Sequence, residues 1–140
     1  RRVLLRSCGS GIETLPGFEV ISDALSAIPN ALVPEAVTVN VLAGVTGSTS
    51  GGLTIALAAL GERFVQAAQA SGIPLEVMHR VASMARGGMD TLPHNGAVIT
   101  LLAVTGLTHR QSYGDIFAIT CIKTLAVFFV IGVYYATGLV

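Results

Sequence analysis

The protein has 140 residues, of which 52% are hydrophobic and only 11% are charged, whereas soluble proteins average roughly 45–50% apolar and about 25% charged residues. Eight basic residues balance eight acidic ones, so no net field attracts nucleic acid, and a nucleic-acid partner is excluded. The mean hydropathy of +0.73 excludes intrinsic disorder. Cys8 and Cys121 lie far apart, form no metal-binding or disulfide pattern, and are expected to be small buried side chains.

The N-terminal part of the chain divides into an unassigned stretch and the start of a single segment. Residues 1–14 are left unassigned, and residues 15–140 are predicted to form one membrane segment. Within it, Gly17–Ile28 has apolar residues at helical spacing, with Glu19 and Asp23 on the opposite side. This pattern predicts an amphipathic helix.

The first long uncharged run contains an internal break. Twenty-six residues without a formal charge separate Glu35 from Glu62, and a membrane crossing needs about 20 mainly apolar residues. Gly44–Gly52, however, reads GVTGSTSGG, with four glycines and four Ser or Thr residues. Glycine and hydroxyl residues disfavour a continuous helix, so a broken helix is predicted here.

A second amphipathic helix is predicted over Pro74–Arg86, with the proline in its first turn and Gly87-Gly88 ending it. Its apolar positions recur at the three- and four-residue spacing of one helix face. The predicted buried stripe comprises Leu75, Met78, Ala82 and Ala85.

The second uncharged run is also interrupted. Nineteen residues separate Asp90 from Arg110, and the tract Leu92–Gly96 reads LPHNG. Only the eleven residues Ala97–Leu107 follow it, which are too few to cross a membrane alone. A half-helix or re-entrant segment is therefore predicted.

The last run, Ile116–Val140, contains a single charge at Lys123. As a helix it would be about 37 Å long, enough to cross the roughly 30 Å hydrocarbon core with tilt. We expect a transmembrane helix. Lys123 lies about two turns from its start, so its ammonium either snorkels to the interface, forms an ion pair, or faces the interior of the bundle.

Two breaks at membrane depth favour a transporter over an enzyme. Irregular backbone is tolerated there only when protein buries it or a polar cavity surrounds it. The Gly47–Gly51 tract lacks the central serine of a nucleophile elbow, because Thr49 stands there. No two of His79, His94 and His109 lie within one helical turn. No catalytic residue, metal site or cofactor is predicted.

Two tracts resemble a known family. They are NVLAGVTGSTSGGLTIALAALG (Asn40–Gly61) and MHRVASMARGGMDTLPHNGAVITLLAVTGLTHRQSYGDIF (Met78–Phe117). Over residues 15–140 the chain resembles the C-terminal part of gluconate permease (GntP) family transporters. Asp90–Gly96 is similar to the form found in the 3-hydroxybutyrate branch, whereas gluconate-type members carry a His-Val-Asn-Asp run there.

The resemblance implies a fold and an activity. Members of this family are multi-pass symporters of the bacterial cytoplasmic (inner) membrane that import organic hydroxy acids with protons. The implied fold is an all-α integral membrane protein with transmembrane helices and re-entrant or broken helices, resembling the C-terminal part of an ion transporter superfamily fold. The chain is shorter than such a permease, so it is expected to be a fragment whose partners include the remainder of the permease.

The two breaks supply the candidate site. Amides at a helix terminus and nearby hydroxyls can bind a carboxylate. A substrate-binding role is predicted for Gly47, Ser48, Thr49, Ser50, Gly51 and Asn95. Close packing through small residues is the alternative for the Gly-Ser-Thr tract. His94 and Asp90 are the candidates for coupled protonation, with a capping or interhelical hydrogen bond as the alternative for His94.

The expected partners are an organic hydroxy acid anion such as 3-hydroxybutyrate or gluconate, a proton or Na+, the lipid bilayer, and a second copy in a homo-oligomer. Other readings stay open. One is a small structural or assembly membrane protein without transport activity, another is a non-functional truncated permease, and a third is an intramembrane hydrolase.

Overall fold

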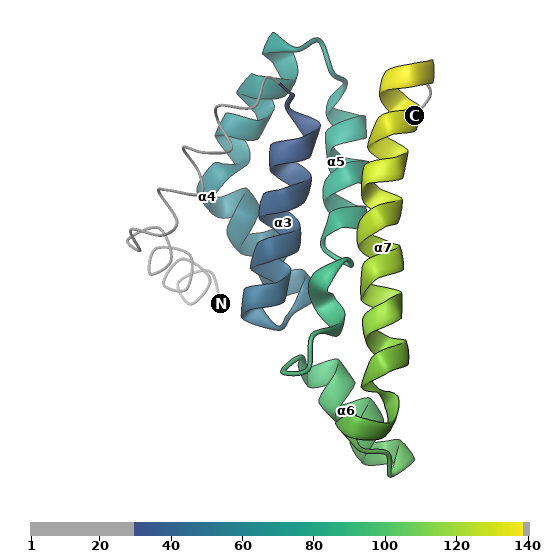
Figure 1. Ribbon diagram of the computed structural model, residues 1–140. Coiled ribbons are helices and arrows are strands. Elements are labelled where there is room, and N and C mark those ends of the chain that lie inside the picture. Colours follow the sequence, from purple (N-terminus) through teal and green to yellow (C-terminus); the bar gives the residue numbers. More distant parts are fainter. Residues whose placement is uncertain (1–29, 139–140) are drawn as a thin grey trace.

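The computed structural model describes residues 30–138, which form helices and no strand (Figure 1). The all-α prediction is confirmed for this part of the chain. The amphipathic helix predicted over Gly17–Ile28 and the unassigned residues 1–14 lie outside it. The elements are α3 (Leu32–Thr46), α4 (Thr49–Ala70), α5 (Leu75–Ala85), the short 3-10 helix η1 (Met89–Thr91), α6 (Gly96–Thr105) and α7 (His109–Thr137).

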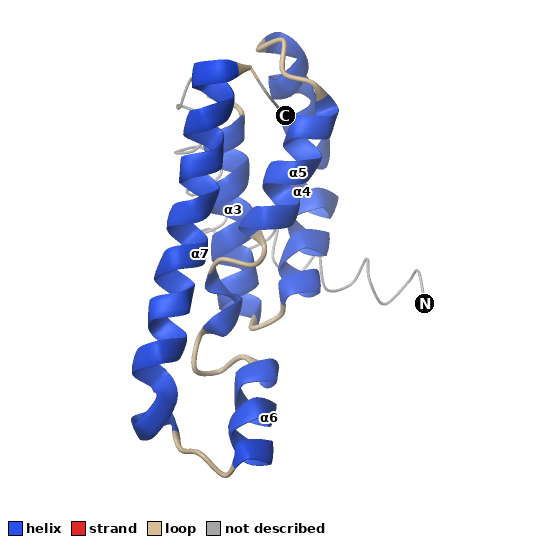
Figure 2. Cartoon of the chain, turned by 90° about the vertical axis from the view of Figure 1, so that its right-hand side faces the viewer, coloured by secondary structure: helices blue, strands red, loops and turns tan. Residues whose placement is uncertain are grey.

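Four of the helices lie side by side in a bundle. In Figure 1, α3 and α5 run down the page while α4 and α7 run up it, and Figure 2 shows the same bundle from the side. Helix α3 contacts α4, α5, η1 and α7, and is therefore the central helix of the described residues. Helix α6 projects beyond one end of the bundle in both views.

The pairing of α3 with α4 depends on a small residue at the crossing. A Cβ atom added at Gly52 would lie 2.3 Å from the backbone nitrogen of Ala43, so only glycine fits where the two backbones meet. From there α4 buries a residue at every fourth position, which forms one ridge of the helix. That ridge comprises Gly52, Ala56, Leu60, Phe64 and Ala68.

Helix α5 confirms the second amphipathic helix, with one correction. It begins at Leu75, after Pro74, and ends at Ala85 before the glycine pair. Leu75 was expected in the buried stripe but is 49% exposed, because it is the first residue of the helix and lies at the edge of the buried face, beside the exposed Glu76 and His79. The buried face instead comprises Val77, Met78, Val81, Ala82 and Ala85.

Helix α7 is the one helix among the described residues that is long and apolar enough to cross a membrane. It begins at His109, seven residues before the predicted start, because the Thr108 backbone N–H donates to Gln111 Oε1 at 3.0 Å and caps an earlier first turn. Only 17% of its most apolar window is buried, unlike the core helix of a soluble protein. Cys121, expected to be buried, is exposed on this helix.

Both predicted helix breaks are present. Helix α3 ends at Thr46, and Gly47 adopts a left-handed conformation with φ of 59° before α4 begins. This interruption is shorter than the predicted Gly44–Gly52, because packing against the bundle holds the flanking glycines in helix. The second break spans η1 and residues 92–95, and the half-helix α6 that follows has only ten residues.

Candidate functional site

The two helix breaks lie against each other. His94 Nε2 is 2.7 Å from the carbonyl oxygen of Gly44 at the end of α3. At the start of α4, the Thr49 hydroxyl donates to Asp90 Oδ2 at 3.0 Å. A Cβ atom at Gly47 would lie 3.0 Å from the His94 ring. Two pairs of predicted site residues, Thr49 with Asp90 and Gly47 with His94, are thus brought together.

Asp90 joins three elements at this junction. One carboxylate oxygen accepts the Thr49 hydroxyl, and the other forms an ion pair with Lys123 of α7. The Asp90 and Lys123 side chains are 23% and 34% exposed. Lys123 was expected to snorkel, to form an ion pair or to face the interior of the bundle. The structure shows the ion pair, with the ammonium directed at Asp90 of η1.

Further polar contacts that the sequence did not single out support the second break. Asn40 is buried, and its Oδ1 accepts the Met89 backbone N–H at 2.7 Å. A Cβ atom at Gly88 would lie 2.4 Å from Asn40 Nδ2, so this glycine permits the approach. The hydroxyls of Thr91 and Thr120 also contact each other. The sequence feature that could have identified Asn40 is that it is a polar residue within an uncharged apolar run.

The two serines of the first break have different surroundings. Ser48 is the N-cap of α4, because its hydroxyl oxygen accepts the Gly51 backbone N–H at 3.2 Å. Ser50 is exposed, and its carbonyl oxygen accepts the Thr54 hydroxyl at 2.8 Å. Among the described residues, no side chain or backbone group bonds the Ser50 hydroxyl, which leaves it available at the start of α4.

Asn95 caps the half-helix that follows the second break. Its side chain is 4% exposed, and its Oδ1 accepts the Ala97 backbone N–H at 2.8 Å. This carbonyl oxygen orients the start of α6. Asn95 therefore lies at the predicted place, with its side-chain oxygen already engaged by the backbone.

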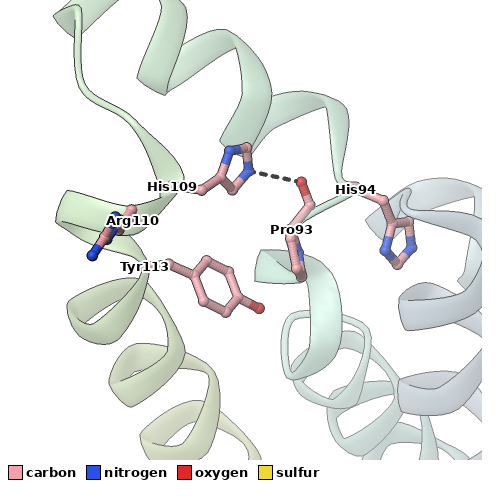
Figure 3. A pocket seen from close by; sticks show the side chains of 5 residues that line it. All are labelled: Pro93, His94, His109, Arg110 and Tyr113. Atoms are coloured by element: carbon pink, nitrogen blue, oxygen red, sulfur yellow. Dashed lines mark hydrogen bonds between the residues drawn. The ribbon is translucent and has the colours of Figure 1, made fainter.

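A surface pocket of about 650 Å³ opens beside the second break. Figure 3 shows the Tyr113 ring directed toward Pro93, with Arg110 pointing away from it. His109 Nε2 is 3.0 Å from the Pro93 carbonyl oxygen. The His94 ring, also at the edge of this pocket, points away from Tyr113, in keeping with its bond to the end of α3.

One further acid lies at the other end of α3. Glu35 is 2% exposed, and its Oε2 has no hydrogen-bond partner within residues 30–138. Burial raises the pKa of this carboxyl, which lies outside α7, from 4.5 to about 8. In the sequence Glu35 served only as the boundary of an uncharged run. The sequence feature that could have identified Glu35 as a candidate is that it is an acidic residue directly before an apolar tract.

Comparison with known proteins identifies one informative relative. The chain is 66% identical, over 133 residues, to the uncharacterized transporter YxjC of Bacillus subtilis (strain 168). The aligned region covers 94% of this chain and 28% of the relative, so the chain spans less than a third of the relative's length. No protein-family model and no solved structure matches the sequence.

Proposed function

We propose that this chain is part of a secondary active transporter that carries an organic hydroxy acid across the cytoplasmic membrane together with a proton. The observation that carries the proposal is the meeting of two helix breaks at Asp90, which contacts Thr49 and Lys123. In many transporters, substrate and coupling ion bind where discontinuous helices meet. The similarity to a protein named a transporter supports the same role.

The start of α4 is the proposed substrate site. The free N–H groups and partial positive charge of a helix N-terminus favour a carboxylate. The exposed Ser50 hydroxyl lies there and has no hydrogen-bond partner among the described residues. Gly47 and Ser48 form the turn before α4, Thr49 and Gly51 lie in the first turn of α4, and Asn95 orients the half-helix α6.

The proposed proton-coupling residues lie at the same junction. His94 links the second break to the end of α3, and Asp90 links it to α4 and α7. A change of protonation at either side chain would alter one of these contacts, because each contact depends on the charge or the tautomer. Such a change would couple proton binding to the relative position of the two breaks.

The proposed protein is a multi-pass permease of the bacterial inner membrane that resembles the gluconate permease family. We propose 3-hydroxybutyrate or a related short hydroxy acid as substrate, on the form of Asp90–Gly96. The proposed partners are the lipid bilayer, the remainder of the permease and a second copy of the chain. Na+ is the alternative coupling ion.

Uptake by proteoliposomes tests the proposal. The complete native polypeptide is reconstituted, and uptake of labelled 3-hydroxybutyrate and of gluconate is measured with and without an inward proton gradient. We expect gradient-driven uptake of 3-hydroxybutyrate, inhibited less by gluconate than by unlabelled 3-hydroxybutyrate. Uptake that responds to a sodium gradient and not to a proton gradient would identify Na+, and not the proton, as the coupling ion. Absence of uptake by correctly inserted protein would contradict the proposed substrate class.

A further inference from the structure

Glu35 is a buried acid that the junction of the two breaks does not use. It lies in the first turn of α3, nine residues before Gly44, which is about 14 Å along the helix axis. The residue is 2% exposed, and in the described part of the chain nothing forms a hydrogen bond with Oε2. Glu35 is therefore separate from the cluster around Asp90 and His94.

Among residues 30–138, no cation forms an ion pair with Glu35. The charged and titratable side chains of α4 and α5 are exposed, namely Glu62, Arg63, Glu76, His79 and Arg80. In η1 and α7, Asp90 and Lys123 pair with each other. The Tyr135 hydroxyl of α7 donates to Asn30, and burial raises the pKa of Glu35.

The two acids of the bundle thus have opposite environments. Asp90 has a cation and a hydroxyl donor, both of which stabilise a carboxylate. Glu35 has neither among the described residues, and burying an unpaired carboxylate costs several kcal/mol, whereas a neutral carboxyl avoids that cost. Thr38, one turn further along α3, is also buried, and no described residue forms a hydrogen bond with its hydroxyl oxygen.

We propose that Glu35 is a second proton-binding site, which holds a proton in the buried state described here and exchanges it with water when α3 moves. This inference rests on the proposed proton symport. Two proton transfers are involved. On the side where protons enter, hydronium gives a proton to the Glu35 carboxylate, so that one O–H bond of hydronium breaks, an O–H bond forms at Glu35 and water is left. On the other side the Glu35 O–H bond breaks and the proton passes to water, which becomes hydronium.

Infrared difference spectroscopy tests proton binding directly. Spectra of the complete polypeptide are recorded across a pH series, and the spectra of the Glu35→Gln variant are subtracted. We expect a protonated-carboxyl band at neutral pH that is lost on moving to alkaline pH and is absent from the variant. A carboxylate signal in place of this band at neutral pH would overturn the proposal, whether or not the protein transports a hydroxy acid.

Transport then tests whether the bound proton is used. In proteoliposomes, Glu35→Gln should lose gradient-driven accumulation but retain substrate exchange, and exchange also reports that the variant folds. Glu35→Asp should restore part of the accumulation. Thr38→Val, which removes a neighbouring buried hydroxyl at similar volume, is the matched control and should accumulate substrate normally. Normal accumulation by Glu35→Gln would overturn the transport role of Glu35. Failure of the unsubstituted protein to take up any hydroxy acid would instead contradict the proposed function.

Discussion

Ser48 and Ser50 show how two neighbouring hydroxyls can have different tasks. The Ser48 hydroxyl accepts a backbone N–H of α4, while that of Ser50 bonds no described residue. We expect Ser50→Ala to raise the apparent KM for the hydroxy acid by a few fold, through loss of one hydrogen bond worth roughly 0.5–1.5 kcal/mol, with unchanged thermal stability. Uptake kinetics measure this effect.

Ser48→Ala is the matched control for that experiment. It removes the N-cap of α4 and should lower the free energy of unfolding by about 1 kcal/mol, an effect that Ser50→Ala should not show. If Ser50→Ala leaves the KM unchanged, the Gly-Ser-Thr tract serves helix packing and not substrate binding.

The environment of Glu35 makes stability depend on pH. Below its unfolded pKa of 4.5 the carboxyl is protonated in both states. As the pH rises from there to about 8, the unfolded chain releases the proton while the folded chain keeps it, so the free energy of unfolding falls. We expect the melting temperature of the complete polypeptide in detergent to decrease over this range.

Two variants isolate that contribution. Glu35→Gln should show a flatter dependence of melting temperature on pH, because the amide does not titrate. Glu62→Gln, at an exposed position of α4, should follow the unsubstituted protein. Equal pH dependence in all three proteins would show that Glu35 does not determine the slope.

At the scale of elements, the contact between α3 and α4 depends on Gly52. Its Cβ position lies 2.3 Å from a backbone nitrogen of α3, so Gly52→Ala forces two backbones apart. We expect a loss of about 1–3 kcal/mol or more in the free energy of unfolding, measured by thermal or denaturant unfolding. Gly61, on the same helix, has no atom within 4 Å of its Cβ position. Gly61→Ala should therefore be neutral or stabilising by up to about 1 kcal/mol, and equal losses in both variants would contradict the close crossing.

The sequence predicted elements better than contacts. Glycine and hydroxyl content located the first break, the LPHNG tract located the second, and apolar periodicity located α5, because these signals are local to a few residues. The start of α7 was missed because the cap at Thr108 lies within a polar stretch. The ion pair of Asp90 with Lys123 was open as one of several alternatives, since 33 residues separate the two positions and tertiary packing alone decides their distance. Glu35 was missed because burial of a single acid at a helix start leaves no periodic signal.

At the scale of the molecule, Asp90 connects η1, α4 and α7. We expect Lys123→Met to leave an uncompensated carboxylate at Asp90 and to reduce thermal stability more than the double variant Asp90→Asn/Lys123→Met does. The coupling energy from the double-mutant cycle should be roughly 0.5–3 kcal/mol. Additive losses would show that the ion pair contributes no stability of its own.

The contact at Gly52 also has a consequence for motion. Because the backbones of α3 and α4 touch there without an intervening side chain, the two helices cannot slide past each other without a clash. We therefore expect α3 and α4 to move together, with Glu35 at one end of α3 and the Gly47 turn at the other. If the bundle opens, we expect the backbone angles to change at the connections between helices, namely at the Gly72 turn before α5 and at the non-helical residues 92–95 before α6. A displacement of Glu35 would then also displace the Gly47–Gly51 tract, because α3 and α4 would tilt together without bending.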